Sequence, residues 1–251
     1  DPCNYYLEEL DQTICSFRKD NIPFAGMLVC SIFANEGLPN VPKNYLSQAS
    51  EMVHSAGGLL ICDEVQSGLC RTGRWWGYED MGVLPDIVTM GKPIGAGVPL
   101  AGVAASRELV EKFRSESRYF NTFASSPLQA AAGNAVLDVI EDEGIQESVQ
   151  AVGGRLLGQL QEIQPDFEQM GDVRGVGLFI GIEWVLDRTT REPDVEGARR
   201  MVETLKDKGF LISHAGAHRN MLKIRPPLVF QQTDSEAFLA AFNETLREIY
   251  G

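Results

Sequence analysis

Short apolar segments alternate with helical periodicity through the first half of the chain. Buried strands are predicted where such segments are bounded by glycine or polar residues, at 25–33, 58–62, 86–91 and 100–106. A helix that ends at Gly57–Gly58 is indicated by apolar residues spaced three and four apart: Leu46, Ala49, Val53 and Ala56. Another helix follows Pro127, with four apolar residues on one face: Leu128, Ala132, Ala135 and Val139. This alternation predicts an α/β fold with a mainly parallel sheet flanked by helices.

The pattern changes in the second half. A hairpin or long strand and two further strands are predicted at 173–185, 210–213 and 221–230. Between them lies a helix that Gly209 ends, with four residues facing inward: Ala198, Met201, Val202 and Leu205. Thr233 and Glu236 form a capping-box pattern that predicts the start of a last helix.

We therefore divide the chain at about residue 142. Residues 1–142 are interpreted as part of a large domain, and residues 143–251 as a small α+β domain. Four predicted strands are few for a doubly wound sheet. We accordingly expect that the N-terminal part of the large domain precedes residue 1.

Composition and charge narrow the classes of function. With 44% hydrophobic and 23% charged residues, the chain has the composition of a soluble globular protein, and no apolar segment is long enough to span a bilayer. The net charge of −13 argues against nucleic acid or an anionic membrane as a partner. Five cysteines without a CxxC spacing, and three distant histidines, predict no metal site. Reduced thiols in a cytoplasmic enzyme are the plain interpretation.

Asp63 ends a predicted apolar strand. Open parallel sheets bind ligands at the carboxyl ends of their strands, so a functional carboxylate is expected at such a position. An ionised carboxylate beside an apolar core lowers the stability of the fold unless a cation pairs with it. A purely structural ion pair with Arg71 or Arg74 is the alternative interpretation.

Lys92 directly follows another predicted strand. Pro93 disfavours the α region for the residue before it, which places Lys92 at a strand end or turn. Of seven lysines, only Lys92 and Lys223 are embedded in apolar surroundings rich in glycine and proline. A partly desolvated lysine becomes a usable amine nucleophile. A lysine that extends from a loop into water is the alternative interpretation.

Lys92 and Asp63 together suit pyridoxal phosphate (PLP). This cofactor needs an amine to form an imine and an anion that keeps its pyridine nitrogen protonated. The segment LLICDEVQSGLCRTGRWWGYEDMGVLPDIVTMGKPIGAGVPLAGV (59–103) closely resembles the core signature of class III (subgroup II) aminotransferases of fold type I. The resemblance extends over essentially the whole chain and includes FNTFASSP (120–127), VRGVGLFIGIE (173–183) and Pro-Pro-Leu near 226–228.

The resemblance implies a role for several residues. Lys92 would carry PLP as a Schiff base and move the proton, and Asp63 would pair with the pyridinium nitrogen. Val65 would pack on one face of the ring, and Gln66 would lie near its phenolate oxygen. Thr122 would donate to the cofactor phosphate of the neighbouring subunit, which implies a homodimer with shared active sites.

Three departures from the family pattern affect these expectations. Family members are longer at the N-terminus, where they carry a phosphate cradle, so the chain looks like the C-terminal portion of such an enzyme. Cys30 stands where many members have a glutamate, and Glu36 is out of register. Lys223 occupies the place of the usual substrate-carboxylate arginine, while Arg225 directly precedes the double proline. In a strand these two residues share a face, so either could bind an anion.

Three hypotheses follow. The leading one is an aminotransferase that moves an amino group between a small amine or amino acid and a 2-oxo acid. The second is a phospho-lyase that eliminates phosphate from an amino-alcohol phosphate, because 218–228 and 86–93 look most similar to the branch of the family that includes such enzymes. The third is a fragment or module that is not catalytic alone.

Overall fold

The computed structural model describes residues 1–123 and 126–251, which form two compact units. The first unit comprises residues 1–32, 41–69 and 74–142, and the second comprises residues 33–40, 70–73 and 143–251. Two short segments from the first half of the sequence thus belong to the second unit, which hydrophobic periodicity did not indicate. The assignment of 1–142 and 143–251 to two domains stays a prediction.

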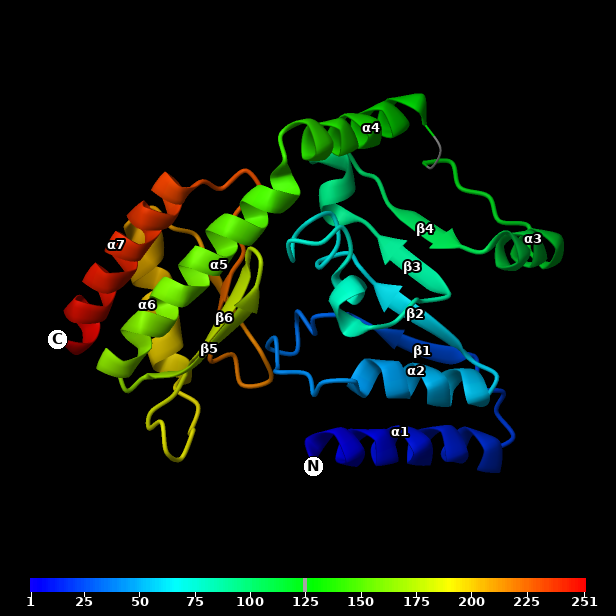
Figure 1. The fold of residues 1–251 in the computed structure, drawn as a ribbon, viewed down its shortest axis with the longest axis horizontal. Helices are drawn as coiled ribbons and strands as arrows, with labels where there is room; N and C mark the ends of the chain where they lie inside the picture. Colours follow the sequence, from blue (N-terminus) through cyan, green and yellow to red (C-terminus); the bar gives the residue numbers. More distant parts are fainter. Residues whose placement is uncertain (124–125) are drawn as a thin grey trace. The chain divides into compact units, whose positions relative to one another are not determined.

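The first unit is built on a mainly parallel sheet in the order β1-β2-β3-β4 (Figure 1). Its strands are β1 (Gly26–Val29), β2 (Leu59–Asp63), β3 (Ile87–Met90) and β4 (Gly102–Ala105). The first three run parallel, and β4 is antiparallel to β3. Asp63 pairs in register with Thr89, so β2 and β3 end side by side at one edge of the sheet.

The helices of the first unit are α1 (Pro2–Lys19), α2 (Tyr45–Ser55), α3 (Arg107–Glu116) and α4 (Pro127–Asp142). As Figure 1 shows, α2 packs on β1 and β2, and α1 packs on α2. The residues that α2 buries include Leu46, Ala49 and Val53, as the periodicity predicted. In α4, however, Leu128, Ala135 and Val139 are exposed, and the buried residues are Gly133 and Ile140.

The second unit has an antiparallel sheet in the order β5-β6-β8-β7. Its strands are β5 (Met170–Val176), β6 (Phe179–Trp184), β7 (Ser213–Ala215) and β8 (Met221–Ile224). The predicted hairpin over 173–185 is confirmed, whereas the strand predicted at 210–213 is wrong except at Ser213. Helices α5 (Ile145–Ile163), α6 (Val195–Asp207) and α7 (Gln232–Tyr250) pack with the sheet around one core (Figure 1).

The last helix starts earlier than the capping pattern predicted. Gln231 is its N-cap residue, and the Gln231 N–H donates to Asp234 Oδ2 at 2.9 Å. Thr233 and Glu236 therefore lie inside the helix. An aspartate three residues after the N-cap forms the capping hydrogen bond, so the polar pair that begins α7 is two residues upstream of the predicted one.

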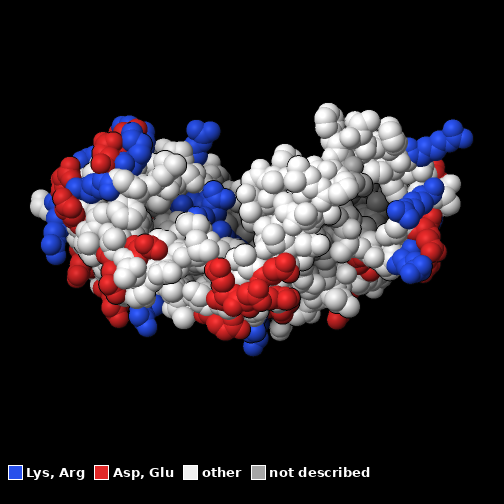
Figure 2. All heavy atoms as spheres, turned by 90° about the horizontal axis from the view of Figure 1, so that it is seen from above, with Lys and Arg blue, Asp and Glu red and all other residues white. Residues whose placement is uncertain are grey.

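No helix among the described residues is long and apolar enough to cross a membrane. Figure 2 shows that acidic side chains gather in one area of the drawn face, while acidic and basic side chains mix elsewhere on it. This face therefore carries both signs of charge, although the whole chain has a net charge of −13.

Candidate active site

Asp63 lies half-buried at the carboxyl end of β2. Its Oδ1 accepts a hydrogen bond from the Val65 N–H at 3.0 Å and lies 3.5 Å from the Thr89 hydroxyl. The first contact comes from the turn that follows β2, and the second comes from the neighbouring strand β3. The carboxylate is thus oriented from two elements at the end of the sheet.

The two arginines of the alternative interpretation have partners other than Asp63. Arg74 Nε donates to Asp80 Oδ1 at 3.1 Å. Arg71 belongs to the second unit and donates to the backbone carbonyls of Leu178 and Pro226. The structure therefore does not support the alternative of a structural ion pair between Asp63 and either arginine.

Lys92 follows β3 after a single glycine and begins a short 3-10 helix, η2 (Lys92–Gly95). Lys92 thus lies at the strand end predicted from Pro93, but its φ is +43°, whereas a following proline favours an extended conformation. A left-handed conformation costs a non-glycine residue about 1–3 kcal/mol, and such strain is concentrated at functional sites. The side chain is exposed, so the expectation that apolar surroundings desolvate Lys92 is wrong for this structure. The neighbouring glycine and proline have no charge, but they do not bury the Lys92 amine.

Asp63 and Lys92 nevertheless belong to one edge of the sheet. Thr89, the register partner of Asp63, lies three residues before Lys92. Val65 lies beside the connection as well, because a Cβ added to Gly91 would be 3.7 Å from Val65 Cγ2. An amine, a carboxylate and an apolar side chain thus come from the ends of two adjacent parallel strands, and this set fits the chemical needs of PLP.

For Gln66 and Thr122 the structure gives burial and local backbone structure. Gln66 is half-buried in the turn after β2. Thr122 is exposed in a bend, and Ala124 and Ser125 of the same motif lie outside the described residues. The roles inferred for Gln66 and Thr122 from the family resemblance stay predictions.

The second unit gathers positive charge around one aromatic ring. Lys223 is buried on β8, where its Nζ lies 5.2 Å from the centroid of the Phe179 ring and 3.3 Å from Asn35 Oδ1. The guanidinium carbon of Arg225, which is exposed, lies 6.0 Å from the same centroid. The two cations predicted to share a face therefore do lie beside one ring.

Arg71 adds a third positive charge to this group. Burial, and next the positive charge of Arg225, lower the pKa of Arg71 to about 10. Arg71 remains protonated at neutral pH, and like charges held close together favour an anion between or beside them. We refer to Arg71, Lys223 and Arg225 as the cationic cluster.

Glu64 is a residue of the site that the sequence analysis missed. It directly follows Asp63, is 2% exposed, and accepts hydrogen bonds from Ser31 and Ser67. The signal in the sequence was a second acidic residue directly after an apolar strand, because a carboxylate there must find donors if it is buried.

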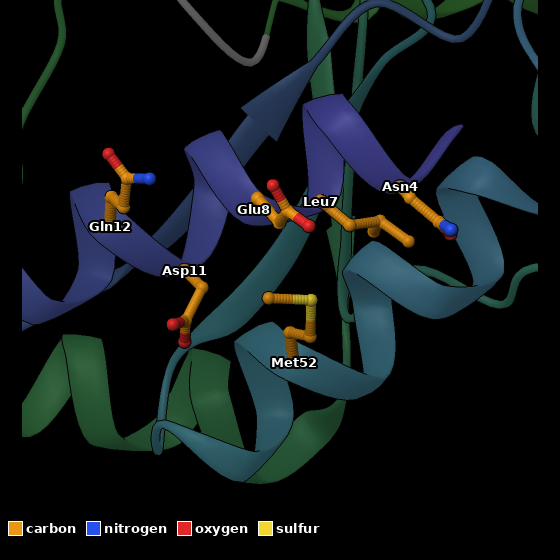
Figure 3. Close-up of a pocket in the computed structure, with 6 residues that line it drawn as sticks. All are labelled: Asn4, Leu7, Glu8, Asp11, Gln12 and Met52. Atoms are coloured by element: carbon orange, nitrogen blue, oxygen red, sulfur yellow. The ribbon is translucent and has the colours of Figure 1, made fainter. Parts of the chain in front are cut away.

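A hollow elsewhere in the first unit has different chemistry. It has a volume of about 390 Å³ and is lined by residues of α1 and α2 (Figure 3): Asn4, Leu7, Glu8, Asp11, Gln12 and Met52. None of these six residues is basic, and two are carboxylates that would repel a phosphate. The lining of this hollow therefore does not suit the phosphate of PLP.

Comparison with known proteins shows the family to which the chain belongs. The family described as "Aminotransferase class-III" matches residues 2–246. The chain belongs to the class-III aminotransferase family. Family membership implies PLP as the cofactor.

Two curated relatives of this family carry different activities in their names. "Ethanolamine-phosphate phospho-lyase homolog 1" of Caenorhabditis elegans is 43% identical over 209 residues, which cover 82% of this chain and 45% of that protein. "Alanine--glyoxylate aminotransferase 2-like" of Drosophila melanogaster is 39% identical over 211 residues, 83% of this chain and 43% of that protein. The chain thus spans about half the length of the curated relatives it matches.

A solved structure confirms the expected fold. An Arthrobacter phospholyase in complex with phosphoethanolamine matches with a TM-score of 0.95 and 36% identity, over 98% of this chain and 58% of the other. The prediction of a partial fold type I large domain followed by a small α+β domain is confirmed by this likeness.

Proposed function

We propose that the protein is a PLP-dependent enzyme acting on a small amino substrate, with Lys92 as the amine that binds the cofactor. The observation that carries this proposal is the placement of Asp63 and Lys92 at the ends of adjacent parallel strands, with Lys92 exposed and in a strained backbone conformation. When bound, PLP supplies a protonated ring that withdraws electrons from the substrate carbon bearing the nitrogen. Asp63 keeps that ring nitrogen protonated, and the Lys92 amine takes up and returns the proton.

Within this chemistry we propose elimination of phosphate from an amino-alcohol phosphate as the reaction. The cationic cluster supports it, because three positive charges suit a phosphate dianion better than a single carboxylate. Lys223 is buried on a strand and held by Asn35, so its charge has a fixed position. In this reaction the Lys92 amine takes the proton from the carbon that bears the nitrogen, and a double bond forms between that carbon and the β-carbon. The bond between the β-carbon and the phosphate oxygen breaks, and the phosphate leaves with the electron pair of that bond. The worm relative and the Arthrobacter structure lend support by their names.

Aminotransfer is the second candidate, favoured by the family description and by the fly relative. Both reactions use Lys92 and Asp63 in the same way. In the elimination, phosphate leaves the β-carbon. In aminotransfer, the amino nitrogen of the substrate is kept by the enzyme and is then passed to a 2-oxo acid. In line with the family resemblance, we propose that the active protein is a homodimer with Thr122 at the partner's cofactor phosphate. We also propose that it is cytoplasmic.

The test uses the full-length protein loaded with PLP. Borohydride reduction followed by peptide mapping should place the cofactor on Lys92, and Lys92→Ala should abolish trapping while Lys112→Ala, on the surface of α3, leaves it unchanged. Incubation with phosphoethanolamine should release phosphate. Transfer of an amino group to a 2-oxo acid without phosphate release would favour the second candidate, and trapping on another lysine would refute the role of Lys92.

A further inference from the structure

Glu64 is the most enclosed carboxylate beside the strand ends, and four donors converge on it. The Ser31 hydroxyl and the Tyr78 N–H donate to Oε1 at 2.7 and 3.1 Å. The Ser67 hydroxyl and the Gly77 N–H donate to Oε2 at 2.8 and 2.7 Å. Each carboxylate oxygen therefore accepts one hydroxyl and one backbone N–H. A carboxylate only accepts hydrogen bonds, so it satisfies all four donors at once.

The backbone around this group is shaped to bring the donors in. A Cβ at Gly77 would lie 2.6 Å from both Ser31 Oγ and Ser67 Cβ, which leaves no room for a side chain at that position. A Cβ at Gly68 would lie 2.8 Å from the Glu64 carbonyl oxygen and 2.9 Å from the Trp76 ring. Two glycines thus allow segments that are distant in sequence to close on one buried carboxylate.

The turn that carries the proposed cofactor contacts is closed by backbone hydrogen bonds, and the Ser67 hydroxyl joins it to the Glu64 carboxylate. The Gly68 N–H donates to the Glu64 carbonyl at 2.9 Å, and the Glu64 N–H donates to the Thr89 carbonyl of β3 at 2.9 Å. Val65 and Gln66 lie inside this closed turn. Within it, the Val65 N–H points back to Asp63 Oδ1 at 3.0 Å.

We propose that Glu64 is a positioning residue for the cofactor. Its carboxylate fixes the turn from Glu64 to Gly68, and this turn sets where the Val65 side chain lies and delivers the Val65 N–H that orients Asp63. Glu64 does not touch the reacting atoms. This inference rests on the proposed roles of Asp63 and Val65, and it adds a residue that acts on the cofactor only through them.

Glu64→Gln is the most informative variant, because the amide keeps the shape of the side chain but replaces one acceptor oxygen by an NH₂ group. A serine hydroxyl can rotate to accept from that group, but a backbone N–H cannot. Whichever way the amide lies, either the Gly77 or the Tyr78 N–H faces another donor and loses its partner. Relief of this repulsion requires the turn to shift, and Val65 shifts with it.

The matched control is Glu79→Gln. Glu79 lies in the same region, its Oε1 accepts from the Trp76 N–H at 2.8 Å, and that contact is exposed to solvent. It undergoes the same change from acid to amide, but water can satisfy the N–H. Ser67→Ala is a milder variant of the network, because it removes one hydroxyl and leaves both backbone N–H donors on the carboxylate.

The experiment measures PLP affinity and the visible circular dichroism of the bound cofactor in the full-length protein, well below its unfolding temperature. We expect Glu64→Gln to weaken PLP binding at least about tenfold and to change the dichroic band, Ser67→Ala to weaken it less, and Glu79→Gln to resemble the wild type. A residue with only a structural role would lower the unfolding temperature and leave the band of the bound cofactor unchanged.

Wild-type affinity and an unchanged band in Glu64→Gln would overturn the inference. If Glu64→Gln does not fold, Ser67→Ala decides in the same way. The outcome is separable from the proposed function. Loss of trapping in Lys92→Ala together with normal PLP binding by both network variants refutes only the role of Glu64, whereas trapping on another lysine refutes the proposed function itself.

Discussion

The two compact units differ in how far their own helices cover their sheets. In the second unit, each residue of β8, and each residue of β6 except Glu183, is buried. In the first unit, by contrast, Leu28 of β1 is 65% exposed and Val103 of β4 is 68% exposed. Mainly parallel sheets are normally covered on both faces. The second unit thus forms a core from its own residues, while the unit that carries Lys92 and Asp63 leaves apolar sheet positions open.

The apolar surface of the first unit includes a hollow beside β4. Its volume is about 660 Å³, and most of its lining side chains are apolar, among them Ile87, Val103, Leu109, Val110, Phe113 and Tyr119. The second unit instead has a contiguous core to which three helices and the sheet contribute. The difference teaches that the unit carrying Asp63 and Lys92 encloses less apolar surface with its own residues, while its buried carboxylate Glu64 is enclosed by polar contacts.

The largest expected effect is in the core of the second unit. Phe242 on α7 is fully buried, so Phe242→Ala should lower the free energy of unfolding by about 3–5 kcal/mol. Leu28→Ala in the first unit should change it by no more than about 0.5 kcal/mol, because Leu28 is already exposed to water. Urea unfolding followed by hydrogen exchange in each unit measures both. A cost for Leu28→Ala as large as that for Phe242→Ala would break the contrast between the units.

Two adjacent glycines test how tightly the second unit is packed. A Cβ at Gly153 of α5 would lie 2.1 Å from the Gly177 carbonyl oxygen, whereas nothing lies within 4 Å of a Cβ at Gly154. Gly153→Ala should therefore destabilise the protein by about 1–3 kcal/mol. Gly154→Ala should stabilise it by up to about 1 kcal/mol through helix propensity. Thermal unfolding of the pair is the measurement, and equal shifts would show that α5 can move away from the hairpin at Gly177.

These contrasts also show what could be predicted from the sequence. Continuous apolar segments located the strands of the first unit, and Asp63 and Lys92 followed from where those strands end. Periodicity identified an apolar face on α4 but not whether anything covers it, and Leu128 is 73% exposed. A helical pattern reports the chemistry of a face, while burial depends on the elements that pack against it.

The Glu64 network and the cationic cluster lay beyond such patterns for a physical reason. Glu64 accepts hydrogen bonds from residues as far apart in the sequence as Ser31 and Tyr78. Lys223 donates to Asn35, which is 188 residues away in the sequence. The spacing of residues in the sequence does not indicate these contacts, because they depend on how the loops fold. The resemblance to class III aminotransferases suggested Lys223 and Arg225, but not the addition of Arg71.

The smallest effect concerns a polar contact that supports the first unit. Asp86, just before β3, accepts from His54 Nε2 at the end of α2 and from the Leu60 N–H, both at 2.8 Å. Burial acts to raise the pKa of Asp86, but these hydrogen bonds and the charge of His54 outweigh it, so the pKa is lowered on folding. The contribution to stability is therefore present above the pKa of the unfolded aspartate, about 4, and is lost as pH falls through the lower pKa of the folded state.

Asp86→Ala should lower the free energy of unfolding by about 1 kcal/mol at pH 7, and this difference from the wild type should shrink as pH falls below about 4. Asp80→Ala is the control, because its pair with Arg74 is exposed and such pairs contribute little. Urea unfolding at a series of pH values measures both variants. A difference that stays constant with pH would mean that the side chain of Asp86 stabilises by shape and not by charge. A difference that shrinks as pH falls would support the contrast between the units. It would show that a charged contact joins α2 to the sheet in the unit that buries less of its apolar surface.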